Sequence, residues 1–168
     1  MPTPLIEDSI EIAASAEQVW SIVSDLRRMS EWSPQVRKVF VRDPVGVGTT
    51  AVTVNRPGWR AWPHGLGKVV MLWSVVWPTR SKVVQLEANE SIAFRILDNN
   101  TVWSYQIEPS GAGVRLTERR VAENVTAFSK FLVDKVLGGN DDFDQDVRRS
   151  IRQTLERIKT VAERDWPS

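Results

Sequence analysis

Few side chains in this chain of 168 residues could carry acid–base or metal chemistry. There is one histidine, His64, and there is no cysteine, so a thiolate nucleophile, a disulfide and a cysteine-ligated metal are excluded. Imidazole chemistry would have to use His64, which follows Trp62-Pro63 in a loop and lacks a nucleophile-elbow motif nearby. We therefore interpret His64 first as a surface or lid residue, with a catalytic base as the alternative.

Two further acid–base candidates lie on predicted strands. Tyr105 alternates with Ile107 on an apolar strand face, which predicts that its side chain points inward. Glu118 alternates with Leu116 and Val114, so it also points inward if those residues form the core. An inward carboxyl needs a partner or takes a raised pKa. Glu118 is thus either an acid–base or orienting group, or one member of a cross-strand ion pair.

Anion and metal binding have weaker support. Arg80 and Arg95 could hold an anionic head group through paired N–H donors. Arg95 shares its predicted strand face with Ala93 and Leu97, so we expect it to point to solvent. The aspartates that follow Asn140 lack the loop glycine and the late glutamate of a calcium loop. We therefore expect no metal site and no cofactor.

The longest predicted element is an amphipathic helix over residues 140–163. Asn140 is the expected N-cap, and aspartates in the first turns and basic residues toward the end match the helix macrodipole. At about 100° per residue, the apolar side chains fall within an arc of roughly 120°. They are Phe143, Val147, Ile151, Leu155, Ile158, Val161 and Ala162. A stripe of this kind needs a partner surface.

Strands upstream can supply that surface. Alternation predicts a half-buried strand at 5–13, followed by a helix that Ser15 caps, with Gln18 completing a capping box. A short helical piece at 26–31 ends before Pro34. Further strands are expected at 36–42, 49–55, 81–87, 91–97, 101–108 and 113–121, and another helix at 123–137. Strands segregated from helices indicate an α+β fold.

The segment 56–76 has a different character. Two prolines and three glycines within 56–68 predict a loop, whereas the apolar run 69–77 fits either a buried strand or a short lid helix. Exposed aromatic side chains are costly without a role. We therefore expect the tryptophans of this segment to form the mouth of a pocket: Trp59, Trp62 and Trp73.

The bulk composition is that of a soluble globular protein, with 42% hydrophobic and 26% charged residues, and one domain over 1–168 is expected. A net charge of +1 gives no strong attraction for nucleic acid or an anionic membrane. The run 69–77 is far shorter than the roughly 20 residues that span a bilayer, so no stable membrane insertion is expected. Met1–Pro4 shows no secretory signal, which favours a cytoplasmic location.

Several short motifs add a resemblance. They are IEIAASAEQVW at 10–20, Ser24-Asp25, Trp32-Ser33-Pro34 with Val36, VVQLE at 83–87, Phe94, Trp103-Ser104-Tyr105 and GVRLTE at 113–118. In this order and spacing, the chain resembles the START-like (SRPBCC) superfamily and, within it, the polyketide cyclase/dehydrase and lipid-transport family. The resemblance covers nearly the whole chain except about 56–76.

This resemblance implies a helix-grip fold, in which a curved antiparallel sheet of six to seven strands surrounds a long C-terminal helix and encloses an internal cavity. Relatives hold lipids, polyketides or other hydrophobic molecules there, and some catalyse aromatisation or cyclisation. We therefore expect binding or transport of a hydrophobic small molecule. A polyketide aromatase/cyclase that uses Tyr105, Glu118 or His64 is the alternative, and a regulatory protein-interaction module is a third; the oligomeric state stays open.

The expected ligand contacts are aromatic and apolar side chains, namely Trp59, Trp62, Trp73, Phe94, Trp103, Tyr105, Phe128, Phe143 and Val147. Against a curved sheet, only part of the helical stripe can be core. We expect the end near Phe143 and Val147 to face the ligand and the end near Ile158 to hold the sheet.

Substitutions at the two ends of this helix should therefore have different effects. Phe143→Ala should weaken ligand binding more than folding. Ile158→Asn should weaken folding more than binding, because burial of a polar amide in the core without a hydrogen-bond partner is unfavourable. Tryptophan fluorescence titration and thermal unfolding measure the two effects. If both variants simply unfold, the helix only fills the core and has no separate ligand-binding end.

Overall fold

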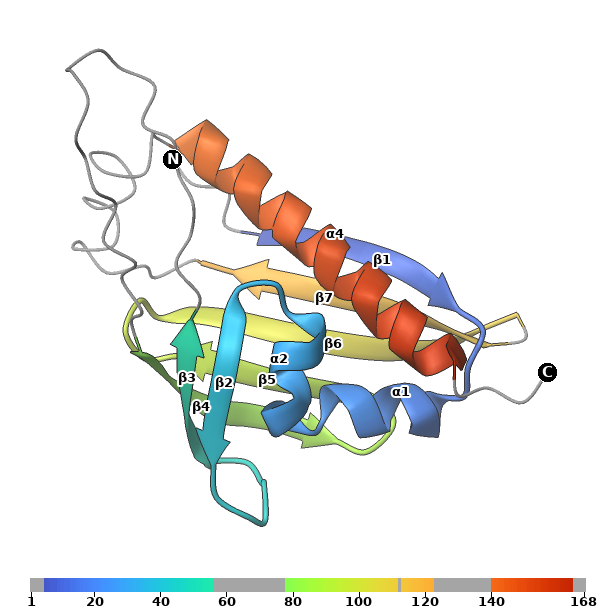
Figure 1. The fold of residues 1–168 in the computed structure, drawn as a ribbon, viewed down its shortest axis with the longest axis horizontal. Coiled ribbons are helices and arrows are strands. Elements are labelled where there is room, and N and C mark those ends of the chain that lie inside the picture. The colour runs from blue at the N-terminus through green and yellow to red at the C-terminus, as the bar shows by residue number, and fades with distance from the viewer. Residues whose placement is uncertain (1–4, 56–77, 112, 123–139, 165–168) are drawn as a thin grey trace.

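A seven-stranded antiparallel sheet curves around the long C-terminal helix α4 (Asn140–Arg164), as Figure 1 shows. The strand order is β1-β7-β6-β5-β4-β3-β2. The strands are β1 (Leu5–Ile12), β2 (Val36–Val41), β3 (Thr50–Asn55), β4 (Pro78–Glu87), β5 (Ser91–Ile96), β6 (Thr101–Ser110) and β7 (Gly113–Val121). The computed structural model describes residues 5–55, 78–111, 113–122 and 140–164, with the backbone alone for 140–143. The α+β class is confirmed, and a strand is present at each place expected from the sequence, with an earlier start for β4.

Strands β2 to β7 form a meander, whereas β1 pairs with β7, the last strand of the chain. In this pairing Asp8 lies opposite Glu118, and Ile10 lies opposite Leu116. On the outer face, Glu11 accepts from Arg115 at 2.7 Å. Exposed pairs of this type add little stability, so the ladder and the apolar inner face hold β1 in place.

The helices α1 (Ala16–Val23) and α2 (Met29–Trp32) connect β1 to β2, with the 3₁₀ turn η1 (Leu26–Arg28) between them. Ser15 is the N-cap of α1, because its hydroxyl accepts from the Gln18 N–H at 3.2 Å. The expected capping box is only half formed. The Gln18 side chain donates instead to the Ala162 carbonyl of α4, at 3.3 Å. This contact ties the first helix to the last.

The apolar stripe of α4 forms the centre of the core. Ile151, Leu155 and Ile158 are each fully buried, which confirms the predicted stripe. They pack against β1 and against α1 and α2, and in Figure 1 all these helices lie over one face of the sheet. Burial of each such side chain contributes about 1.5–3 kcal/mol.

Strand β4 begins three residues earlier than the sequence predicts. Pro78 is its first residue and lies opposite Val54 of β3. Proline has no N–H to donate to the ladder, and the first position of a strand is one of the places that tolerate it. Within the described ranges, no helix is both long and apolar enough to cross a membrane.

Gly113 starts β7 where the chain passes very close to the end of β1. A Cβ atom added here would lie 2.1 Å from the Ile12 carbonyl oxygen. Gly113→Ala should therefore push β1 and β7 apart and lower the free energy of unfolding by about 1–3 kcal/mol. Urea unfolding measures this loss. Gly46→Ala is the matched control, because nothing lies within 4 Å of its added Cβ; equal losses in both variants would contradict the prediction.

Candidate functional site

A buried hydrogen bond joins two polar side chains on the inner face of the sheet. Tyr105 of β6 lies opposite Glu118 of β7 in the strand register. The Tyr105 hydroxyl donates to Glu118 Oε1 at 2.8 Å. Both residues are only 3% exposed. The structure thus brings together two of the three acid–base candidates that the sequence suggests.

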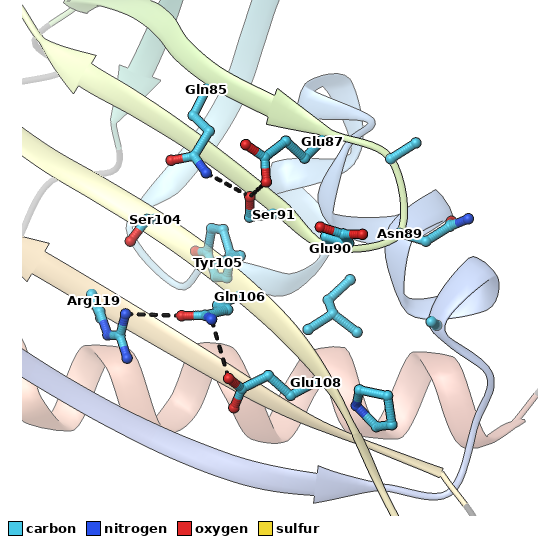
Figure 2. A pocket seen from close by; sticks show the side chains of 14 residues that line it. Gln85, Glu87, Asn89, Glu90, Ser91, Ser104, Tyr105, Gln106, Glu108 and Arg119 are labelled. Atoms are coloured by element: carbon cyan, nitrogen blue, oxygen red, sulfur yellow. Dashed lines mark hydrogen bonds between the residues drawn. The ribbon is translucent and has the colours of Figure 1, made fainter.

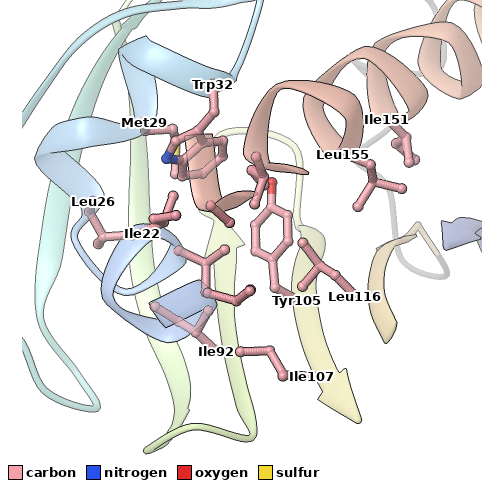
Figure 3. Close-up of a cluster of buried hydrophobic side chains, with 14 of the residues drawn as sticks. Ile22, Leu26, Met29, Trp32, Ile92, Tyr105, Ile107, Leu116, Ile151 and Leu155 are labelled. Carbon is pink, nitrogen blue, oxygen red and sulfur yellow. The ribbon is translucent and has the colours of Figure 1, made fainter. Parts of the chain in front are cut away.

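Aromatic and aliphatic side chains surround this pair. The Trp32 ring packs edge to face against the Tyr105 ring, with the two ring centroids 5.5 Å apart. The centroid of the Phe94 ring is 6.5 Å from that of the Tyr105 ring. Figure 3 shows the Tyr105 ring between Trp32 and Leu116, with its hydroxyl directed toward the helices. The hydroxyl–carboxyl pair therefore lies in a region of low polarity, where electrostatic effects are strong.

This environment changes the acidity of both groups. Burial raises the pKa of Glu118 to about 8; the negative charge of Asp8 across the β1–β7 ladder adds to the rise, and the Tyr105 hydrogen bond opposes it. Burial, followed by the neighbouring Glu118 carboxyl, raises the pKa of Tyr105 well above its ordinary value. Both side chains consequently keep their protons at neutral pH.

A further polar residue on this face was missed by the sequence reasoning. Arg120 is only 5% exposed and lies two residues beyond Glu118 on β7. Burial lowers the pKa of its guanidinium group, and Asp144 of α4 acts in the opposite direction. The signal was present, because the alternation that places Glu118 inward also places Arg120 inward. At the edge of this face, Arg152 of α4 forms an ion pair with Asp8 at 3.2 Å.

The described apolar candidates lie on the same face. Phe94 and Trp103 are opposite each other in the β5–β6 register, with Phe94 buried and Trp103 half-buried. Val147 of α4 is buried in the same core cluster. The remaining candidates, and the run 69–77, lie outside the described residues: Trp59, Trp62, His64, Trp73, Phe128 and the side chain of Phe143.

The two arginines that were candidates for binding an anionic head group do not lie on the inner face. Arg95 is exposed, as predicted, and donates to Asn100 Oδ1 at 2.8 Å. Arg80 is also exposed and forms an ion pair with Asp98 at 3.3 Å. Neither belongs to the inner face. In the part of the chain that the structure describes, no group of three or more acidic or histidine side chains could hold a metal ion.

An open concavity of about 740 Å³ lies mainly against the outer face of the sheet, and its lining also includes Tyr105 and Ile107 of β6 and Ala16 of α1. Figure 2 shows it with α4 behind the strands. Its polar side chains bond one another: Gln85 donates to Ser91 at 2.8 Å, and Arg119 donates to Gln106 at 2.9 Å. Because these groups satisfy each other beside solvent, the concavity is a solvated polar surface, and we place the candidate site on the inner face.

A curved antiparallel sheet around a long C-terminal helix is the helix-grip fold of START-like proteins. The family model described as polyketide cyclase / dehydrase and lipid transport matches residues 3–163. The chain belongs to this family, which confirms the resemblance seen in the sequence. No functionally curated protein matches the chain significantly.

Solved structures show the same fold. The di-domain aromatase/cyclase StfQ of the steffimycin biosynthetic pathway is 15% identical with a TM-score of 0.69; the match covers 96% of this chain and 51% of StfQ, so this chain spans about half of that protein. The ZhuI aromatase/cyclase from Streptomyces sp. R1128 is 16% identical, with a TM-score of 0.69 and coverage of 95% and 93%. The polyketide-cyclase-like protein Cgl2372 from Corynebacterium glutamicum is 29% identical, with a TM-score of 0.59 and coverage of 96% and 91%.

The Glu118 carboxyl should make stability depend on pH. Its pKa is about 8 in the folded protein, above the ordinary value of 4.5. Between pH 4.5 and about pH 8, the folded protein therefore retains a proton that the unfolded chain has released. The free energy of unfolding should therefore fall as pH rises through this window, by up to about 1.4 kcal/mol per pH unit. Glu118→Gln should remove this component, as urea unfolding at several pH values will measure.

Glu108→Gln is the control for this experiment. Glu108 is exposed on the outer face of β6, next to Gln106, so the variant should keep the pH dependence of the wild-type protein. Identical slopes in wild type and Glu118→Gln would show that Glu118 does not titrate in this way.

Proposed function

We propose that this protein binds a hydrophobic small molecule, lipid or polyketide-like, between the inner face of the sheet and α4. The observation that carries the proposal is the buried Tyr105–Glu118 hydrogen bond within a face of aromatic and aliphatic side chains. Ligand sites of this class combine a mostly apolar wall with a few polar groups that fix orientation. The wall would supply most of the affinity, and the pair would orient the ligand.

Stability alone is a poor explanation for this pair. A buried polar atom without a hydrogen-bond partner costs about 1–3 kcal/mol, and a pair of apolar residues of similar shape would avoid that cost. Glu118 Oε2 is buried and has no such partner among the described residues. Strongly shifted ionisable groups of this kind concentrate at functional sites. The position of the pair on the face that α4 covers supports a role in binding.

The comparisons support the same class of ligand. The matching family is described by polyketide cyclisation or dehydration and by lipid transport, and all of these involve largely apolar molecules. StfQ and ZhuI are aromatase/cyclases. At 15% and 16% identity they share the fold with this chain, and we therefore include aromatic polyketides among the molecules to test.

An aromatase/cyclase is the second candidate function. It is favoured by the pKa of about 8 at Glu118, because a proton-transfer group works best when its pKa is near the operating pH. Glu118 would exchange a proton with a bound polyketide-like substrate, and Tyr105 would orient the carboxyl. Loss of turnover in Glu118→Gln with binding retained would favour this function over a carrier.

The binding proposal is tested by native mass spectrometry of the purified full chain and by tryptophan fluorescence titration with fatty acids and aromatic polyketides. A co-purifying hydrophobe or saturable quenching is expected. Phe94→Ala should weaken binding by about tenfold or more, because it removes a buried aromatic wall. Phe40→Ala, which removes a ring that is 53% exposed, should leave binding unchanged.

Folding of both variants is checked by circular dichroism, and Phe94→Leu replaces Phe94→Ala if the latter does not fold. No bound hydrophobe and no quenching by any of these molecules would overturn the proposal. Equal losses in the Phe94 and Phe40 variants would also overturn it.

A further inference from the structure

The Glu118 carboxyl has one satisfied and one unsatisfied oxygen. Oε1 accepts the Tyr105 hydroxyl proton at 2.8 Å. Oε2 is buried and has no hydrogen-bond partner in the described part of the chain. Since Oε1 already receives a donated hydrogen, the proton of the neutral carboxyl belongs on Oε2. Oε2–H is then a buried hydrogen-bond donor on the inner face of the sheet.

The charged groups around Glu118 favour this neutral form. Asp8 lies opposite it on β1, and its negative charge opposes a second one nearby. The basic groups on this side are engaged elsewhere: Arg152 of α4 pairs with Asp8, and Arg120 interacts with Asp144 of α4. Within the described ranges, no basic side chain forms an ion pair with Glu118, so nothing compensates its charge there.

We propose that Glu118 determines ligand specificity at this site, by donating a hydrogen bond from Oε2 to an uncharged acceptor, such as a ketone, ester or ether oxygen, on a hydrophobic ligand. This inference rests on the proposed function and names the residue that selects the ligand. A ligand acceptor would give the buried Glu118 Oε2–H the hydrogen-bond partner that it otherwise lacks. Ligands with such an acceptor are therefore favoured over ligands without one.

The same geometry disfavours an anionic head group. A ligand carboxylate beside Glu118 would lie close to Asp8, and burial of an unpaired anion is strongly unfavourable. Arg120, the buried cation on the strand that carries Glu118, already interacts with Asp144. The site therefore selects a neutral acceptor over a free fatty acid of similar size.

Three probes of nearly equal shape test the selection in the full-length chain. They are 1-acetylnaphthalene, which carries a ketone, 1-ethylnaphthalene, which lacks it, and 1-naphthoate, which is anionic. At about pH 6.5 the ketone should bind about tenfold or more tightly than each of the other two, as measured by fluorescence titration. The preference for the ketone over 1-ethylnaphthalene should disappear at about pH 9.5, because Glu118, with a pKa of about 8, then loses the donated proton.

Two variants distinguish the effect of the hydrogen-bond donor on Glu118 from the effect of the size of its side chain. Glu118→Gln places an amide N–H where Oε2–H lies and keeps an oxygen for Tyr105, so it should retain the ketone preference at both pH values. Glu118→Leu should bind both neutral probes with similar affinity at both pH values. Glu108→Gln, on the outer face, should behave like the wild-type protein. Circular dichroism confirms that each variant is folded.

The outcomes distinguish this inference from the proposed function. If the neutral probes bind equally, if the wild-type preference does not depend on pH, or if Glu118→Gln loses the preference, the role of Glu118 is overturned while hydrophobe binding stands. Tighter binding of 1-naphthoate than of the ketone overturns it as well. If none of these probes and no other hydrophobe binds, both proposals fail.

Discussion

Burial of the apolar side of α4 is the interaction on which the rest of the structure depends. Ile151, Leu155 and Ile158 are fully buried against elements from the first quarter of the chain. Polar contacts join the same distant segments, such as Lys159 Nζ donating to the Glu11 carbonyl at 2.7 Å. Because a contact such as this one links residues 148 positions apart, the loop-closure entropy is large, and extensive apolar burial must compensate for it.

The candidate site exists because this helix covers polar groups on the sheet. Tyr105 and Glu118 would be hydrated on an uncovered sheet, and their pKa values would be close to ordinary ones. Under α4, α1 and α2 they lose water, and the carboxyl becomes a neutral group at physiological pH. The element that completes the fold thus also sets the chemistry of the inner face, while the polar outer face stays hydrated.

Much of the secondary structure could be predicted because it depends on local pattern. Alternation located the strands, and Ile151, Leu155 and Ile158 of the α4 stripe are buried as their spacing indicates. The errors occur where a distant residue competes with a local one. Gln18 bonds to Ala162 and not to Ser15, and Pro78 belongs to β4 because β3 lies beside it. Arg120 was overlooked although its alternation was visible, since an inward arginine is rare without a partner.

The sequence by itself determined the fold class, the family and the inward direction of Tyr105 and Glu118, because each follows from residue order and a repeat of two along a strand. Only the tertiary structure decided that these two side chains meet at 2.8 Å, because strand register is set by long-range pairing. It also decided that Glu118 Oε2 is buried, that Asp8 lies across from it, and that Arg120 interacts with Asp144. Burial and neighbouring charge set the acidity of a carboxyl, and both are properties of the folded chain.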